Sequence, residues 1–123
     1  MVVDTSALLA LLFNEKHGVW VEEQLSEFEA DLRMSTVNLA ELLILLQDRQ
    51  PQLFESIQEE ILLSPIRFVP PTVSQSRIAA AARLKFPLNL GDCFAYALAK
   101  EENCPILTLD SDFKKTDIEV LMP

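Results

Sequence analysis

Residues 1–12, MVVDTSALLALL, decide the fold expected for this chain. A short aliphatic run ends in a carboxylate, Asp4, and an apolar run of helix-forming residues follows it. Asp4 is therefore expected where a buried strand passes into a helix. In open α/β sheets, ligand sites lie at the carboxyl ends of the strands. Asp is also a favoured N-cap, so the sequence leaves two roles open for Asp4, a site residue or a helix cap.

Short aliphatic segments and segments of helical periodicity alternate along the rest of the chain. Strands are expected at residues 2–4, 32–35, 66–69 and 105–110, with an edge strand at 118–122. Three helices are expected in the first half of the chain: at residues 5–13, around Val21, Leu25 and Phe28, and from an N-cap at Thr36 to residue 50. Three more are expected in the second half: from Pro51 to Leu62, after a cap at Thr72 or Ser74, and over Leu90–Glu102. This alternation predicts an α/β fold with a mainly parallel central sheet flanked by helices. The length fits a single domain spanning residues 1–123.

The composition excludes several classes of protein. No apolar run approaches the ~18 residues of a membrane-spanning helix, and no signal peptide is recognisable, so we expect a cytoplasmic protein with no membrane partner. Cys93 and Cys104 are interpreted as buried hydrophobic residues and not as a disulfide framework. His17, the only histidine, allows neither a zinc cluster nor a two-histidine mechanism. Two glycines are too few for a P-loop or a dinucleotide fingerprint.

Further acidic residues stand at positions that could meet Asp4. Glu41 lies in TVNLAELLILL, a helix with apolar neighbours on nearly every side, where an unpaired carboxylate is costly to bury. Asp92 opens an apolar helix. Asp110 ends an aliphatic strand, and Asp112 lies two residues further on. Together with Asp4, two strand ends and two helices therefore carry candidate site residues.

Each of these acids also has an explanation that requires no site. Glu41 could share a narrow solvent-facing stripe with Asn38 and Asp48, and Asp92 could serve only the helix dipole. The two aspartates after the last strand could be turn residues. The set as a whole favours a site, because strand ends and helix starts share one edge of a parallel sheet. Carboxylates gathered there repel one another and need a cation, and an oxygen-rich cluster suits Mg²⁺ or Mn²⁺.

Four stretches, in order, carry a family resemblance: VVDTSALLALL, TVNLAELLILL, LNLGDCFAYALA and PILTLDSDF. With them the chain resembles, over nearly all of its length, a PIN-domain ribonuclease of the small toxin type found in VapBC toxin–antitoxin pairs. The resemblance implies a PIN-like fold and an endoribonuclease that hydrolyses RNA with a metal-activated water, using Mg²⁺ or Mn²⁺. It also implies a homodimer and inhibition by a cognate antitoxin protein.

The resemblance assigns roles residue by residue. The positions that match the family's metal-binding and catalytic acids are Asp4, Glu41, Asp92 and Asp110, and Asp112 matches a further metal-site acid of more variable role. Candidates for contacts to the metal ligands or to substrate are Thr5, Ser6, Asn38 and Thr108.

The surface charge departs from what general RNA binding needs. A formal net charge of −9 argues against a broad basic surface that holds nucleic acid. The cations available for phosphate contact are Arg77, Arg83, Lys85, Lys114 and Lys115. Much of the acidic excess lies in glutamate-rich helix faces that we interpret as solvated.

Two other functions remain open at this level. One is a catalytically inactive PIN-like binding module whose acidic cluster docks a partner protein. The other is a phosphatase with an aspartyl nucleophile, which places two acids as D-x-D after its first strand. Here the corresponding residues are Asp4, Thr5 and Ser6, so the second acid is missing.

Overall fold

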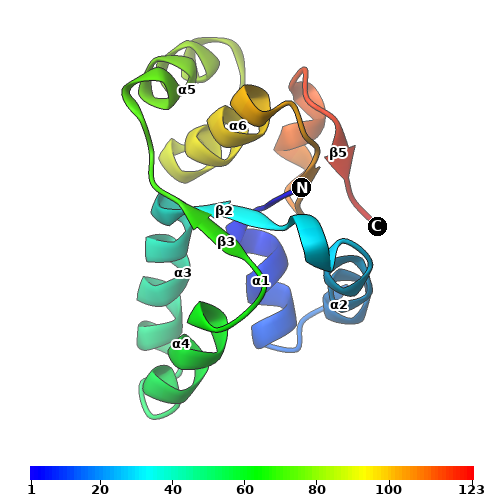
Figure 1. Ribbon diagram of the computed structural model, residues 1–123, viewed down its shortest axis with the longest axis vertical. Coiled ribbons are helices and arrows are strands. Elements are labelled where there is room, and N and C mark those ends of the chain that lie inside the picture. Colours follow the sequence, from blue (N-terminus) through cyan, green and yellow to red (C-terminus); the bar gives the residue numbers. More distant parts are fainter.

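The computed structural model describes residues 1–123. At its centre is a five-stranded sheet in which every pair of neighbouring strands is parallel (Figure 1). The strands are β1 (Val2–Val3), β2 (Arg33–Ser35), β3 (Arg67–Val69), β4 (Ile106–Leu107) and β5 (Val120–Leu121), in the spatial order β3-β2-β1-β4-β5. The predicted parallel α/β fold is confirmed, and so is the predicted edge strand near the end of the chain.

Helices cover both faces of this sheet. The α-helices are α1 (Thr5–Leu12), α2 (Gly18–Glu27), α3 (Thr36–Arg49), α4 (Phe54–Leu62), α5 (Val73–Lys85) and α6 (Leu90–Glu102). Two short 3₁₀ helices are η1 (Glu29–Asp31) and η2 (Ser111–Lys115). Helices α1 to α4 lie on one side of the sheet, and α5 and α6 lie on the other (Figure 1).

Two hydrophobic cores flank the sheet, because neighbouring residues of a strand point to opposite faces. Val3 and Leu107 pack in the core on the side of α1 to α4. Val2 and Ile106 pack in the core on the side of α5 and α6. All four side chains are fully buried. The uninterrupted aliphatic runs of β1 and β4 are therefore the pattern that central parallel strands require.

The first strand, β1, lies in the middle of the sheet, and the strand order reverses its direction there. From β1 the sheet extends through β2 to β3 in one direction and through β4 to β5 in the other. Helices α5 and α6 bring the chain back from the edge strand β3 to β4. In such sheets, ligands bind at the carboxyl ends of the strands where the direction of the strand order reverses. Asp4 follows β1 and Asp110 follows β4, on either side of that point.

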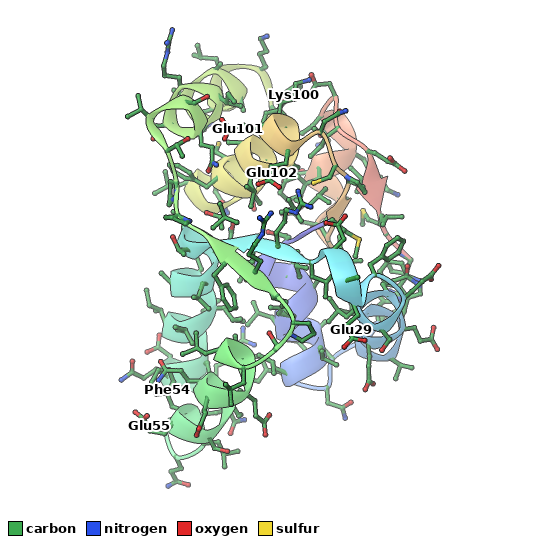
Figure 2. The ribbon with its side chains drawn as sticks, viewed as in Figure 1. Glu29, Phe54, Glu55, Lys100, Glu101 and Glu102 are labelled. Atoms are coloured by element: carbon green, nitrogen blue, oxygen red, sulfur yellow. The ribbon has the colours of Figure 1, made fainter.

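Ion pairs hold the C-terminal end of α6 at the opposite edge of the sheet. Glu102, its last residue, pairs with Arg33 and with Arg67 (3.4 Å), which are the first residues of β2 and β3. Figure 2 shows Glu102 together with Lys100 and Glu101 at this end of the helix. The N-terminal end of α6, which carries Asp92, therefore lies toward the carboxyl ends of the strands.

The start of α3 differs by one residue from the expectation. Its N-cap is Ser35, whose hydroxyl accepts a hydrogen bond from the Val37 amide (3.3 Å), and Thr36 is already helical. Ser35 has extended backbone angles, because it is also the last residue of β2. The strand thus passes into the helix without a connecting loop.

The start of α4 also differs. The helix begins at Phe54 and not at Pro51. Pro51 instead follows Gln50 in a turn that is closed by a hydrogen bond from the Leu53 amide to the Gln50 carbonyl (3.0 Å). The fixed φ of proline suits the second position of a turn as well as the first turn of a helix. Of the two caps considered for α5, Thr72 is the one observed, since its hydroxyl accepts from the Gln75 amide.

Cys93 is buried, Cys104 is partly buried, and both are free thiols. His17 is exposed and lies directly before α2 with a left-handed φ of 71°. None of the helices has the length and apolarity needed to span a membrane.

Candidate active site at the carboxyl edge of the sheet

Asp4 is a buried carboxylate held by two hydroxyl groups. Only 3% of the residue is exposed. Its Oδ2 accepts hydrogen bonds from Ser6 Oγ and Thr108 Oγ1, each at 2.8 Å. Asp4 occupies the N-cap position of α1, but its side chain makes no capping hydrogen bond. Of the two roles that the sequence left open, the structure therefore excludes that of a side-chain cap.

Glu41 is oriented by two donors on the same oxygen. Thr5 Oγ1 donates to Glu41 Oε1 at 2.8 Å, and Asn38 Nδ2 donates to that oxygen at 3.0 Å. Asn38 Nδ2 also donates to the Gly91 carbonyl at 3.0 Å, which ties α3 to α6. The other carboxylate oxygen, Oε2, accepts no hydrogen bond, so it is free to take a ligand or a proton.

The solvent-stripe interpretation of α3 is wrong for Asn38. Asn38 is completely buried, and Glu41 is only partly exposed. Asp48, the third residue, is exposed. The amide oxygen Oδ1 of Asn38 is buried without a hydrogen-bond partner. A buried polar atom without a partner requires an explanation that a solvated surface does not give.

Asp92 lies in the first turn of α6, as the sequence predicted, and takes part in the cap of that helix. It forms a capping box with Asn89: the Asp92 amide donates to Asn89 Oδ1 (2.9 Å), and the Asn89 amide donates to Asp92 Oδ2 (3.1 Å). The residue is buried. Because the capping box uses Oδ2, the other oxygen of Asp92 remains available toward the neighbouring acids.

Asp110 and Asp112 belong to a turn that follows β4. The strand ends at Leu107, earlier than expected, and Thr108 Oγ1 accepts from the Asp110 amide at 3.0 Å. Asp110 Oδ1 in turn accepts from the Asp112 amide at 2.9 Å and caps η2. Asp112 points to Lys115, with its Oδ1 3.4 Å from Lys115 Nζ. Thr108 therefore links the Asp4 carboxylate to the backbone of Asp110. Asp112 faces Lys115 instead.

The four central carboxylates act on one another electrostatically. Burial raises the pKa of Asp4 above its ordinary value, and the charge of Glu41 adds to the effect, although the hydroxyls of Ser6 and Thr108 oppose it. The pKa of Asp92 is raised to about 7, mainly by burial and in addition by the charges of Asp4, Asp110 and Glu41, although the backbone hydrogen bond at Asn89 opposes the shift. Raised pKa values caused by burial and by neighbouring like charges make these acids candidates for a functional site.

The donor set fits a hard divalent cation. Asp4, Glu41, Asp92 and Asp110 offer only oxygen atoms, and such ligands suit Mg²⁺ or Mn²⁺. Their side chains do not by themselves form a ready-made group of three or more metal ligands. An ion would therefore have to draw the carboxylates together, and it would offset the repulsion that raises the pKa values of Asp4 and Asp92.

Two residues of the site escaped the sequence interpretation. Asn89 completes the capping box of Asp92, and the signal for it was an Asn three residues before an Asp at a helix start. Gly91 leaves the space that the Glu41 carboxylate fills. No local pattern could have revealed this role, because Glu41 and Gly91 meet only through the packing of α3 on α6.

The family model of the PIN domain matches residues 1–119. The chain therefore belongs to the PIN-domain family.

The similarity to individual proteins is more specific than the match to the family model. The chain is 34% identical to Ribonuclease VapC36 of Mycobacterium tuberculosis, and the match covers 97% of this chain and 91% of the relative. Its fold is similar to that of the crystal structure of VapC20, a sarcin–ricin loop cleaving toxin of Mycobacterium tuberculosis, with a TM-score of 0.84, 18% identity, and coverage of 99% and 98% of the two chains. It is also similar to a toxin–antitoxin complex from Klebsiella pneumoniae, with a TM-score of 0.79, 18% identity, and coverage of 99% and 96%.

Proposed function

We propose that this protein is an endoribonuclease and the toxin of a type II toxin–antitoxin pair. Its relatives at 33–34% identity over nearly their whole length are named VapC ribonucleases. The observation that carries the proposal is that Asp92 lies close enough to Asp4, Glu41 and Asp110, in a PIN domain, for their charges to raise its pKa. The substrate is RNA, and the reaction is hydrolysis of its phosphodiester bonds.

The cofactor that we propose is Mg²⁺ or Mn²⁺. Asp4, Asp92 and Asp110 would hold it, with Glu41 as a further ligand or as the base. The ion supplies positive charge that stabilises the developing charge at phosphorus and lowers the pKa of a water molecule. We keep Asp112 as an outlying metal-site candidate, because its contact with Lys115 draws it away from the other four.

The chain's own residues have distinct parts in this mechanism. Glu41 Oε2 accepts the proton of the attacking water, since Thr5 and Asn38 occupy Oε1 and fix the orientation of the carboxylate. Ser6 and Thr108 hold Asp4 in one rotamer through its Oδ2. The capping box keeps Asp92 at the first turn of α6. These contacts position the acids before substrate binds, which lowers the reorganisation that the reaction needs.

The partners follow from the same assignment. We propose a cognate antitoxin protein that inhibits the toxin, because solved relatives of this fold include a toxin–antitoxin complex. We further propose a homodimer, a cytoplasmic location and one domain over residues 1–123.

The first test is cleavage of a mixed RNA pool by purified protein. The reactions contain Mg²⁺, Mn²⁺ or chelator, and a parallel set uses Asp92→Asn. We expect cutting that depends on the metal and is lost in the variant, and the cut ends would then identify the target. A folded wild-type protein that cuts no RNA under any condition would support the inactive binding module instead.

A further inference from the structure

An apolar hollow lies between α1, α2 and the C-terminal end of α4, on the side of the sheet that these helices cover (Figure 1). Its volume is about 310 Å³. Leu11, Leu12 and Leu25 line it and are partly exposed. Leu8 and Ile61 also line it and belong to the buried core. The hollow therefore exposes aliphatic side chains that continue directly into the core of the protein.

The hollow lies away from the candidate acids. Leu32 and Ile66, two of its lining residues, directly precede β2 and β3, and Leu12 is the last residue of α1. These positions belong to the amino ends of the strands, whereas Asp4 and Asp110 follow their strands at the carboxyl ends. None of the candidate acids lines the hollow. A group that fills the hollow therefore does not cover the acids.

Three glutamates stand at the rim of the hollow. Glu22 comes from α2, Glu29 from η1 and Glu60 from α4. All three are exposed, and none of them forms an ion pair. No lysine or arginine lines the hollow. An apolar centre with a charged rim is the anatomy of a protein interface, and an unneutralised acidic rim is complementary to a basic partner.

The acidic excess of the whole chain lies in the part that builds this hollow. Residues 1–65, which contain α1 to α4, hold 12 of the 19 acidic residues and 3 of the 10 lysines and arginines. Residues 66–123 hold seven of each kind, so the formal net charge of −9 arises entirely in the first part. Such a field attracts cations and repels phosphate groups. A nucleic acid is therefore not the partner that the hollow fits.

We propose that the hollow is a docking site for a segment of another protein that presents aliphatic side chains between lysines or arginines. The aliphatic side chains pack on Leu11, Leu12 and Leu25, and the cations pair with the three rim glutamates. A short amphipathic helix presents these groups together, because residues three and four apart share one face. The inference is independent of the proposed nuclease, since the occupant contacts none of the candidate acids.

A second copy of the chain is a less suitable occupant. The chain's own exposed aliphatic residue between two cations is Leu84, which is 90% exposed and stands between Arg83 and Lys85. It belongs to α5, on the other side of the sheet from the hollow (Figure 1). A contact between these two surfaces is head-to-tail and gives rings or open filaments, whereas most soluble oligomers are closed two-fold dimers. The occupant is therefore a different protein.

The proposal is tested by fluorescence anisotropy with a labelled synthetic peptide. The peptide has about 15 residues, enough for a helix, with leucines at helical spacing and lysines between them. A reference peptide has glutamate in place of every lysine. We expect the wild type to bind the basic peptide more weakly as salt rises, because exposed ion pairs are screened, and not to bind the reference peptide.

Two variants examine the two parts of the site. The rim variant combines Glu22→Gln, Glu29→Gln and Glu60→Gln, and is expected to raise Kd about tenfold, the effect of losing three exposed ion pairs. The filled variant is Ser26→Phe, at an exposed position of α2 that lines the hollow. It is expected to raise Kd about tenfold without a change of charge. Circular dichroism verifies that both variants are folded.

Each variant has a matched control on the same helices. Glu23→Gln, Glu27→Gln and Glu55→Gln together remove the same charge at exposed positions outside the hollow, and Ser56→Phe adds the same ring outside it. Both controls are expected to bind the peptide within about twofold of the wild type, a small change against the tenfold loss.

Four results would overturn the docking site. These are a wild type that does not bind the basic peptide, equal losses in the rim variant and its control, tight binding by the filled variant, and a change of oligomeric mass in the variants without peptide. The last result, measured by sedimentation, would mean that a second copy occupies the hollow. RNA cleavage by all of these variants is expected to equal that of the wild type, so failure of the nuclease proposal is seen separately.

Discussion

The carboxylate of Glu41 occupies the space that a side chain would need at Gly91. A Cβ placed on Gly91 would lie 2.4 Å from Cδ, Oε1 and Oε2 of Glu41. Glycine is required here by close approach and not by its backbone angles, since no glycine in the chain has a positive φ. The absence of a side chain in the first turn of α6 thus lets α3 present its carboxylate to Asp92.

Gly91→Ala is expected to leave the stability of the fold nearly unchanged and to reduce the cleavage of RNA. The atoms that the new methyl group meets belong to the end of a flexible side chain, so Glu41 can swing away and the fold can persist. Alanine is favoured over glycine in a helix by about 1 kcal/mol, which offsets the lost contacts. We expect a melting temperature close to that of the wild type and cleavage reduced at least tenfold, measured by circular dichroism and by RNA cleavage.

Gly18→Ala is the matched control for this prediction. There the added Cβ would lie 2.8 Å from the backbone carbonyl oxygen of Ala10, which cannot move aside cheaply. This variant is expected to lose stability while retaining cleavage at temperatures where it is folded. Equal loss of cleavage in both folded variants would mean that the Glu41 contact has no special part in the site.

Asp92→Asn is expected to stabilise the metal-free protein at neutral and alkaline pH. The folded pKa of Asp92 is about 7, raised above its ordinary value of 3.8 mainly by burial. Between these two pH values the folded chain keeps a proton that the unfolded chain releases, so the wild type loses stability as pH rises through this window. Asparagine removes that loss, which we place at about 1–2 kcal/mol after screening by solvent.

The measurement is thermal unfolding of both proteins in chelator from pH 4 to pH 8.5. The difference in melting temperature is expected to be small at pH 4, to grow up to about pH 7, and to level off above it. A difference that is independent of pH would show that Asp92 is ionised throughout and that its neighbours do not oppose its charge.

Added Mn²⁺ or Mg²⁺ is expected to raise the melting temperature of the wild type at pH 7.5. A ligand at a hundred times its Kd stabilises the folded state by about 2.7 kcal/mol. The effect should weaken below pH 7, because protons then compete with the ion for Asp92 and Asp4, whose pKa values are raised. Differential scanning fluorimetry over a series of metal concentrations measures it.

Two variants make the metal experiment specific. Asp92→Asn is expected to lose most of the stabilisation by the ion. Asp48→Asn removes an exposed carboxylate of α3 outside the site and is expected to respond like the wild type. Identical responses from all three proteins would place the ion elsewhere on this acidic chain.

Thr108→Val is expected to impair both the fold and the reaction. The Thr108 hydroxyl donates to Asp4 Oδ2 and accepts from the Asp110 amide, and the residue is fully buried. Removing it takes one of the two donors from Asp4 Oδ2 and leaves the Asp110 amide without its acceptor, at a cost of about 1–3 kcal/mol. Chemical denaturation measures the loss of stability, and RNA cleavage measures the loss of positioning at Asp4.

Thr108→Ser distinguishes two causes of the effect of Thr108→Val, the loss of the hydroxyl group and the change in side-chain shape. Serine keeps the hydroxyl and lacks only the methyl group, so we expect it to recover most of the cleavage activity. If serine is as inactive as valine, packing of the methyl group and not hydrogen bonding holds Asp4 in place.

Local chemistry in the sequence determined the class of fold and most of the candidate acids. Uninterrupted aliphatic runs such as Val2–Val3 indicate strands buried on both faces, and their alternation with helical segments requires parallel pairing. Carboxylates directly after such strands lie at a predictable edge of the sheet, which is why Asp4 and Asp110 could be named as candidates in advance.

Tertiary structure alone decided how the acids are oriented and which of them meet. The strand order β3-β2-β1-β4-β5 brings the ends of β1 and β4 together, although about a hundred residues separate them. Thr5, Asn38 and Gly91 become neighbours of Glu41 only when α1, α3 and α6 pack on one sheet. Asp112, equally acidic and almost adjacent in sequence to Asp110, turns to Lys115 instead. Spacing along the chain predicts which edge of a sheet a residue occupies, but hydrogen bonds and packing between distant segments determine the direction of its side chain.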